Sequence, residues 1–210
     1  VSHLNIMGGT HATASREFLL PNAFNAKHTK MLKDAVNIPV FIGHNIFSPE
    51  DAEKMLAEGN ADFVALGRSQ LADPAWAKKA KEGRASDIKP CINCLIGCID
   101  RGMLSHTPIH CTVNPSLYRF ECKPVEKAET RKQVAVVGAG PTGCEAALTA
   151  SKRGHQVTIY EKRCIGGAMI EASKPENKAN IKRLIHYYED HIMHDPNITL
   201  VKKEVEYETL

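Results

Sequence analysis

Apolar residues in the first part of the chain gather in short runs, at residues 3–7, 38–43 and 61–66, and each run meets a glycine. The run at residues 38–43 is continuous, which is typical of a strand that is buried on both faces. Stretches with helical features lie between and after them, at residues 27–36, 49–58 and 73–83. Strands that alternate with helices at this spacing predict parallel βα units.

Local signals refine two of these helices. Ser48 followed by Pro49 is a strong start signal, because serine caps a helix and proline fits its first position. In the helix over residues 27–36, the apolar positions expected on one face are Met31, Leu32, Ala35 and Val36.

A second set of elements follows residues 123–132, a charged stretch with Pro124 that is typical of a linker. Strands are expected at residues 134–137, 156–160 and 198–201, and helices at residues 144–153 and 180–191. The inward face of the last helix is expected to contain Ile181, Leu184, Ile185 and Tyr188.

These patterns predict an α/β protein in two parts. Three strands cannot close a barrel, and an eight-stranded barrel typically needs about 250 residues. The first part would therefore be the C-terminal part of a TIM (β/α)8 barrel, with a small open sheet as the alternative. The second part fits the first half of a Rossmann-like dinucleotide-binding domain.

Composition and charge exclude several classes of protein. The 210 residues carry a formal net charge of +3, with basic and acidic residues interspersed, so no nucleic-acid partner is expected. No apolar run approaches the roughly 20 residues that cross a bilayer, and the first residues show no secretory pattern. We therefore expect a cytoplasmic protein without a membrane partner, and the sequence is compatible with a homo-oligomer.

Four of the seven cysteines form a C-x2-C-x3-C-x12-C pattern: Cys91, Cys94, Cys98 and Cys111. In a reducing compartment, clustered thiols more often bind metal than pair with each other. A compact trio with a distant fourth supplies the four ligands of an iron–sulfur cubane. Structural zinc needs four ligands too, usually from two C-x2-C knuckles. The spacing therefore favours a cluster. His106 and His110 are nearby and could compete as metal ligands, so zinc stays an alternative.

A glycine-rich sequence, G-x-G-x-x-G, runs from Gly138 through Gly140 to Gly143. A strand is expected before it and a helix after it, and Glu161 follows the next strand, about 20 residues on. Such glycines let the backbone approach a pyrophosphate, and the acid can accept hydrogen bonds from ribose hydroxyls. A tight packing turn is the alternative. A second glycine pair, Gly166 and Gly167, lies shortly after the acid.

This order of motifs resembles the iron–sulfur flavoenzymes related to old yellow enzyme, over almost the whole chain. That family includes 2,4-dienoyl-CoA reductases, 2-enoate reductases, bile-acid-inducible oxidoreductases and trimethylamine dehydrogenase. The resemblance implies FMN in the barrel, a [4Fe-4S] cluster, FAD in the following domain, and NAD(P)H as electron donor. It implies four segments: residues 1–90 as the end of the FMN barrel, 91–122 as the cluster segment, 123–132 as the linker, and 133–210 as the nucleotide domain.

Site residues follow from the resemblance one at a time. The cysteine set matches the family's cluster ligands, and Gly138, Gly140, Gly143, Glu161 and Gly167 match its nucleotide site. Gly43 and the pair Gly67-Arg68 match its loops for the FMN phosphate. Many relatives have Arg or Gly where Asn45 stands, which puts a guanidinium contact to flavin in doubt. His11 resembles the active-site histidine that helps to protonate substrate.

The implied activity is NAD(P)H-dependent reduction of the C=C bond of an α,β-unsaturated carbonyl compound, with electrons passing from FAD through the cluster to FMN. An amine dehydrogenase of the trimethylamine type and a non-enzymatic zinc-stabilised nucleotide-binding module are the alternatives. Because the earlier barrel strands are not in this sequence, the 210 residues by themselves are expected to be inactive as an enoyl reductase.

Overall fold

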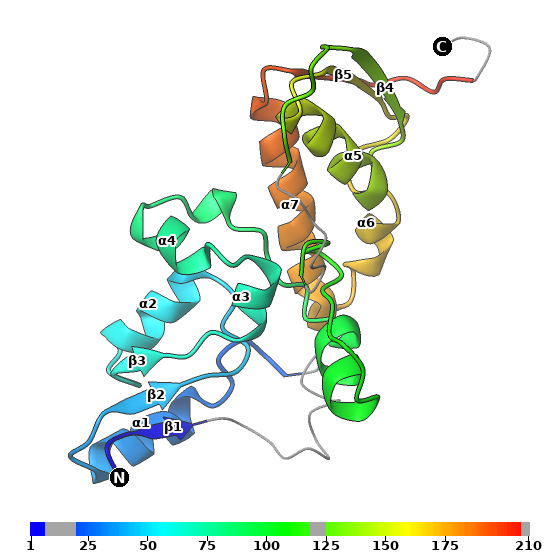
Figure 1. Ribbon diagram of the computed structural model, residues 1–210. Helices are drawn as coiled ribbons and strands as arrows, with labels where there is room; N and C mark the ends of the chain where they lie inside the picture. Colours follow the sequence, from blue (N-terminus) through cyan, green and yellow to red (C-terminus); the bar gives the residue numbers. More distant parts are fainter. Residues whose placement is uncertain (7–19, 118–124, 207–210) are drawn as a thin grey trace. The chain divides into compact units, whose positions relative to one another are not determined.

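The computed structural model of the chain describes residues 1–6, 20–117 and 125–206. They belong to two compact units, Val1–Arg119 and Phe120–Leu210, which we describe separately (Figure 1). His11 and Cys122 lie outside the described residues. Within the described ranges, none of the helices is long and apolar enough to cross a membrane. The domain limits expected at residues 90, 122 and 132 stay predictions.

The first unit contains a parallel sheet with the strand order β1-β2-β3. Its strands are β1 (Leu4–Ile6), β2 (Val40–Ile42) and β3 (Phe63–Val64). They are shorter than the apolar runs predict. Pro39 has no N–H and cannot join the ladder, although its carbonyl accepts a hydrogen bond from the Leu4 N–H at 3.0 Å. The parallel βα arrangement predicted from the sequence is confirmed.

Four helices accompany this sheet: α1 (Ala26–Ala35), α2 (Pro49–Ala57), α3 (Arg68–Ala72) and α4 (Trp76–Lys81). The predicted start of α2 is confirmed, because the Ser48 side chain accepts a hydrogen bond from the Asp51 N–H at 3.1 Å. Gly59, at φ +66°, follows the end of this helix. The sequence did not predict α3, since five residues are too few to show a helical period.

The core of the first unit lies on the face of the sheet that carries Val40 and Ile42, both of them fully buried. On the other face Phe41 stacks on Phe63, with ring centroids 4.7 Å apart. The apolar positions expected on one face of α1 are not the buried ones: Met31 is 62% and Leu32 41% exposed. The helix packs on β2, and Thr29 is its buried residue.

The second unit contains another parallel sheet, of order β4-β5-β6. Its strands are β4 (Gln133–Val137), β5 (Gln156–Tyr160) and β6 (Ile198–Val201). Its helices are α5 (Pro141–Lys152), α6 (Ala168–Ala172) and α7 (Ala179–His194). The register pairs Val137 with Tyr160, and Ile159 with Leu200. Each strand lies within a residue of its prediction.

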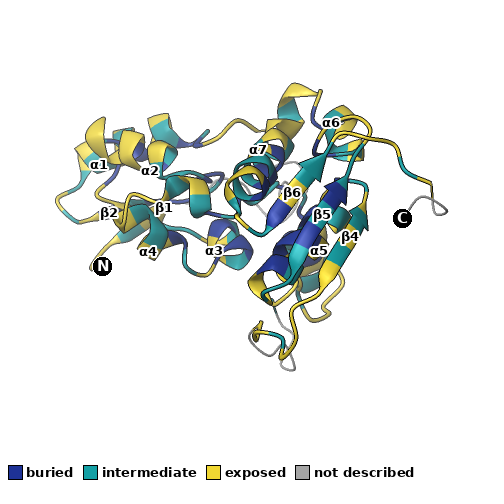
Figure 2. Ribbon diagram, turned by 90° about the horizontal axis from the view of Figure 1, so that it is seen from above, coloured by how far each residue is buried: buried dark blue, intermediate teal, exposed yellow. Residues whose placement is uncertain are grey.

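The core of this unit forms where α5 and α7 pack on the sheet (Figure 1). Figure 2 shows β5 as the most deeply buried strand, and Val157 and Ile159 are fully buried in it. Leu184 and Tyr188 of α7 are buried as predicted. The Tyr188 hydroxyl donates to Glu145 Oε1 at 2.8 Å, which joins the two helices by a polar contact.

Candidate functional site

The first two cysteines of the motif lie on a turn with unusual backbone geometry. Asn93 has φ +55° and Leu95 has φ +61°. Asparagine adopts this left-handed region more readily than most residues, but leucine does so rarely, and such strain concentrates at functional sites. The Asn93 N–H donates to Cys91 Sγ at 3.4 Å. Cys94 Sγ lies 3.3 Å from the hydroxyl of Thr112.

The third cysteine, Cys98, lies on a wide helical segment, η3 (Ile96–Leu104). Its hydrogen bonds span five residues, as between the Asp100 N–H and the Leu95 carbonyl at 3.0 Å, and wide turns of this kind are frequent at functional sites. The His110 N–H donates to the Gly97 carbonyl at 2.8 Å. A Cβ atom at Gly97 would lie 2.3 Å from the His110 carbonyl oxygen. Glycine here lets the chain return and brings Cys111 back to the other cysteines.

One cavity brings together all the predicted metal ligands. Its wall includes Cys91, Cys94, Cys98 and Cys111, together with Arg68, Leu71 and Leu95. Across the described ranges, no three His, Cys, Asp or Glu side chains are grouped tightly enough to hold a single metal ion. Tetrahedral zinc needs sulfurs about 3.8 Å apart, given Zn–S bonds of about 2.3 Å. In a cubane each thiolate binds its own iron, so the ligands stand further apart. Four thiolates are the donor set of a cubane and of a structural zinc ion alike, so the expected cluster stays a prediction.

Burial controls the ionisation of two of the thiols. It raises the pKa of Cys91 to about 12, against smaller lowering effects of the Asn93 N–H and the positive charge of Arg68. Burial also raises the pKa of Cys98. A thiol must lose its proton to bind metal, so loading of this site releases protons. Without metal, these two cysteines are neutral thiols at pH 7.

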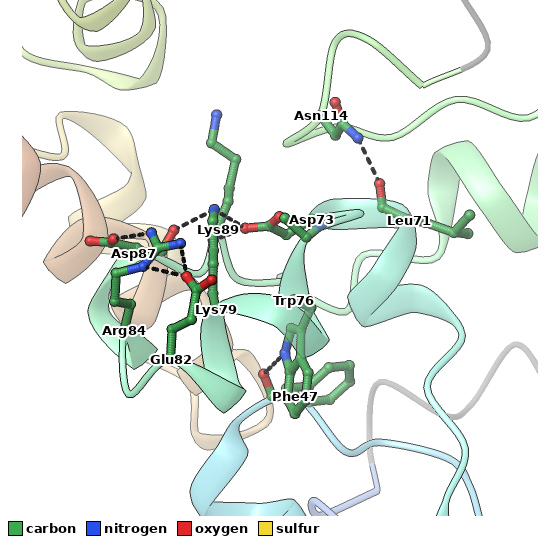
Figure 3. Close-up of polar contacts among 11 residues, drawn as sticks. Phe47, Leu71, Asp73, Trp76, Lys79, Glu82, Arg84, Asp87, Lys89 and Asn114 are labelled. Carbon is green, nitrogen blue, oxygen red and sulfur yellow. Dashed lines mark hydrogen bonds and ion pairs between the residues drawn. The ribbon is translucent and has the colours of Figure 1, made fainter.

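Two hydrogen bonds connect the ends of the cysteine segment, residues 89–114, to α3 and to Asp73, the residue after α3 (Figure 3). Before the first cysteine, the Lys89 N–H donates to Asp73 Oδ2 at 3.0 Å. After the last one, Asn114 Nδ2 donates to the Leu71 carbonyl at 2.9 Å. Lys79 Nζ adds an ion pair with Asp73 Oδ2 at 2.6 Å. The segment is thus fixed at both ends to residues just after Arg68.

The glycines expected at the FMN phosphate lie at the carboxyl ends of neighbouring strands. Gly43 follows β2, and its N–H donates to the Ile6 carbonyl at 3.2 Å. Gly67 stands between β3 and α3, and Arg68 is the first residue of that helix. The carboxyl end of barrel strands is where phosphate sites are commonly found. These positions agree with the expected role, which stays a prediction, as does the role of His11.

The G-x-G-x-x-G loop connects β4 to α5. Gly138 has φ +92°, which favours glycine, and Gly140 caps α5. A Cβ atom at Gly143 would lie 1.9 Å from the Gly138 carbonyl oxygen, so the helix approaches the loop too closely for a side chain. The second glycine pair packs on the same loop: a Cβ atom at Gly167 would lie 3.0 Å from Gly140 Cα.

Glu161 lies beside this loop. Its Oε2 atom accepts a hydrogen bond from the Ala139 N–H at 2.8 Å, and its Oε1 atom accepts one from the Arg163 N–H at 2.7 Å. Desolvation tends to raise the pKa of Glu161, but these hydrogen bonds and the nearby cations outweigh it and lower the pKa. An ionised carboxylate can only accept hydrogen bonds. It therefore suits hydroxyl donors such as those of a ribose.

Sequence reasoning missed two groups of residues at the cysteine centre. Asn45 and Asn93 both accept hydrogen bonds from Arg68, and they are almost fully buried. An asparagine inside a C-x2-C knuckle is a usable signal, because few other residues combine left-handed backbone with a short acceptor. Gly97 and Gly102, at the close approach of η3 to residues 109–110, were missed as well. Of the two histidines named as competing zinc ligands, His106 is exposed and not in the cavity wall, whereas His110 is in the wall.

Comparison with known proteins agrees with this geometry. Residues 4–87 match the model of the NADH:flavin oxidoreductase / NADH oxidase family, and residues 118–206 match that of pyridine nucleotide-disulphide oxidoreductases. An NADH oxidase from Thermoanaerobacter brockii is 50% identical over 153 residues, which cover 72% of this chain and 24% of that protein. A bilirubin reductase from Mediterraneibacter gnavus is 36% identical, over 89% of this chain and 29% of its own length.

Solved structures give the same result. A 2-naphthoyl-CoA reductase matches with a TM-score of 0.86 and 31% identity, over 91% of this chain and 30% of that one. A dimethylamine dehydrogenase from Hyphomicrobium sp. is also similar in sequence, at 34% identity over 74% of this chain and 21% of that protein. The chain thus spans less than a third of the length of each of these proteins.

The predicted fold class, the end of a flavin barrel followed by the start of a Rossmann-like domain, is confirmed by these matches and by the two parallel sheets. The cofactors of the two matched families are flavin and nicotinamide nucleotides. The resemblance to flavoenzymes seen in the sequence is confirmed as well. This chain belongs to the NADH:flavin oxidoreductase / NADH oxidase family over residues 4–87, followed by a pyridine nucleotide-disulphide oxidoreductase domain over residues 118–206.

Proposed function

We propose that this chain belongs to an NAD(P)H-dependent iron–sulfur flavoenzyme that reduces the C=C bond of an α,β-unsaturated carbonyl compound. One observation carries the proposal: four cysteines line a single cavity whose wall also contains Arg68, at the carboxyl end of a strand in a flavin-family unit. The second unit adds a nucleotide-binding loop in a pyridine nucleotide family. Reductases among the similar proteins support reduction as the direction of the reaction.

Cys91, Cys94, Cys98 and Cys111 are the residues that would hold a [4Fe-4S] cluster. Such a cluster, when bound, supplies one-electron transfer between FAD and FMN, which exchange electrons in pairs with their substrates. The chain shields and orients this site. Leu71 and Leu95 form an apolar part of the wall and limit the access of water, while the left-handed turn at Asn93 sets the direction of the first two thiols.

The flavin phosphate is assigned to the loops that follow β2 and β3. Gly43 and Gly67 place backbone there without side chains, and Arg68 supplies a guanidinium, which recognises phosphate through several N–H donors. In the second unit, the loop from Gly138 to Gly143, with Gly167 packed on it, is assigned to the pyrophosphate of FAD. Glu161 is assigned to the ribose.

His11 is proposed as a group that helps to deliver a proton to the substrate carbon during the addition of hydrogen. Its neighbours in sequence, Gly8-Gly9-Thr10, follow the strand that contains Leu4–Ile6. Catalytic groups of barrel enzymes lie on loops after strands. Histidine is the side chain that most often transfers protons in enzymes.

An amine dehydrogenase is the second candidate, favoured by the similarity to dimethylamine dehydrogenase. The two functions differ in the direction of electron flow. In the intact enzyme containing this chain, anaerobic NAD(P)H should bleach the flavin absorbance, and an unsaturated thioester or carboxylic acid should restore it. Bleaching by dimethylamine, with no response to NAD(P)H, would support the amine dehydrogenase and overturn the reductase.

The metal assignment has its own test. Anaerobic purification should give brown protein with about four irons per chain, and Cys94→Ser should remove most of this iron. Cys164→Ser is the matched control, because Cys164 is an exposed thiol outside the cavity wall and should leave the iron content unchanged. Colourless protein with one zinc ion per chain would refute the cluster and favour the zinc-stabilised module.

A further inference from the structure

Arg68 is held in place from three sides. Its Nη2 atom donates to Asn45 Oδ1 at 2.6 Å, and its Nη1 atom donates to Asn93 Oδ1. Its guanidinium carbon lies 5.5 Å from the centre of the Phe47 ring, within the range of a cation–π contact. Phe47, Asn45 and Asn93 are each less than 5% exposed. The guanidinium therefore has a fixed position, and its buried partners exclude water from the side on which they lie, while Arg68 itself is half-buried.

The same guanidinium lines the cavity of the four cysteines. Both asparagines are uncharged and accept hydrogen bonds from Arg68 through their side-chain oxygens. Asn93 also donates its backbone N–H to Cys91 Sγ. Asn93 thus contacts Arg68 through its side chain and Cys91 through its main chain.

We propose that Asn93 is a positioning residue that fixes the Arg68 guanidinium beside the cysteine centre, where the arginine charge raises the centre's reduction potential. This inference rests on the proposed [4Fe-4S] function of the four cysteines. It gives Arg68 a role toward the cysteine centre in addition to the one toward the flavin phosphate.

The physical reason is the change of charge on reduction. One electron enters the centre and no proton needs to follow, so the net charge of the centre falls by one. A nearby fixed cation stabilises the more negative state, and this effect is strong where the surroundings are poor in water. Arginine stays protonated at any working pH. The influence of the Arg68 charge on the reduction potential depends on its distance from the centre. The Asn93 side chain and the Phe47 ring hold the guanidinium at that distance.

The test is the midpoint potential of the reconstituted centre, titrated anaerobically with dithionite and followed by visible absorbance and electron paramagnetic resonance. No flavin is added, so that weaker flavin binding does not contribute. Arg68→Gln should lower the reduced-to-oxidised ratio at a given potential about tenfold, which is ~59 mV for one electron. Asn93→Ala keeps the charge but releases it, and should shift the potential in the same direction by a smaller amount. Arg68→Lys, which keeps a positive charge, should lower the midpoint potential less than Arg68→Gln does.

Arg101→Gln is the matched control. Arg101 lies on η3 of the same segment, but outside the cavity wall, and its Nε atom donates to the exposed Pro108 carbonyl. Solvent should screen its charge, so the potential should change little. An unchanged potential in Arg68→Gln or in Asn93→Ala with full iron content would overturn the proposal. So would an equal shift in Arg101→Gln, because net charge alone would then explain the effect.

The iron content separates this proposal from the one on which it rests. If the unaltered chain binds no iron, the cluster assignment itself is wrong. If the unaltered chain loads iron and Arg68→Gln does not, the potential of Asn93→Ala decides, since this variant keeps both the arginine and all four cysteines.

Discussion

The N–H of Lys89, which lies two residues before the first cysteine of the centre, donates a hydrogen bond to Asp73 Oδ2 at 3.0 Å. Asp73 Oδ1 accepts a second backbone hydrogen bond, from the Ala75 N–H at 3.0 Å, and Lys79 Nζ pairs with Oδ2 (Figure 3). The Asp73 residue is only 6% exposed. The buried Asp73 carboxylate thus connects the start of the cysteine segment to α4.

Asp73→Asn should therefore lower the free energy of unfolding of the first unit by about 2 kcal/mol, because the charged hydrogen bonds of a buried group are lost. Urea denaturation followed by tryptophan fluorescence measures this unit alone, since Trp76 is the only tryptophan of the chain and is buried in the unit. Glu82→Gln is the control: Glu82 forms an exposed ion pair with Arg84, and its loss should have little effect. Equal effects of the two substitutions would contradict this role of Asp73.

The same carboxylate predicts a pH dependence. Desolvation tends to raise the pKa of Asp73, but Lys79 and the N–H groups of Lys89 and Ala75 outweigh it, so the folded-state pKa is lowered. Its contribution to stability is fully present above the unfolded value of about 3.9 and is lost as pH falls through the folded pKa. The stability difference between the unaltered chain and Asp73→Asn should be constant from pH 6 to 8 and shrink below about pH 4. A difference that grows in acid would refute the assignment.

Gly97→Ala should reduce the iron content of the purified chain. The added methyl group would lie 2.3 Å from the His110 carbonyl oxygen, which is backbone and cannot rotate away, so Cys111 is pushed from the other cysteines. Gly102→Ala is a matched comparison, since its methyl group would meet only the Cγ2 atom of the Ile109 side chain, at 2.6 Å. We expect a larger loss of iron in Gly97→Ala than in Gly102→Ala, measured against protein concentration. The opposite order would contradict the close approach.

Two glycines of the nucleotide loop should respond differently to alanine. Gly143→Ala creates a backbone clash with Gly138 and should destabilise the second unit by about 3 kcal/mol. Gly140 has an ordinary φ of −72°, and a Cβ atom there would meet nothing within 4 Å, so Gly140→Ala should fold normally. If the pyrophosphate of FAD binds at this loop, Gly140→Ala should still weaken FAD binding. Limited proteolysis measures folding, and quenching of flavin fluorescence measures binding; normal FAD binding by Gly140→Ala would argue against the assigned loop.

Much of the architecture could be predicted because its signals are local. The strand at Gln156–Tyr160 was predicted at its observed bounds, since apolar Val157 and Ile159 alternate with other residues in a short stretch that an acid closes. The Ser48-Pro49 start of α2 depends on neighbouring residues only. The four cysteines line one cavity, and their spacing already keeps three of them within eight residues of sequence.

The remaining features depend on contacts between residues that are distant in sequence. Nothing near Arg68 in the sequence indicates that Asn45 and Asn93 hold its guanidinium, since these residues stand more than 20 positions away on either side. The exposure of Met31 was missed for the same reason: helical periodicity identifies an apolar face, but not which face packs on the sheet. The His110 N–H donates to the Gly97 carbonyl within η3, a contact that spacing does not show.

The contact between Gly97 and His110 has a consequence for how this centre can vary among proteins. It closes the segment between Cys98 and Cys111 at its base, while residues 104–107 are exposed at its far end. Residues can be inserted or deleted at the exposed end without moving either cysteine, because the cost of a longer loop rises slowly with its length. The spacing of twelve residues between Cys98 and Cys111 is then incidental. A sequence search that requires this spacing would overlook proteins with the same centre. A small residue directly before the third cysteine is a better criterion for finding them.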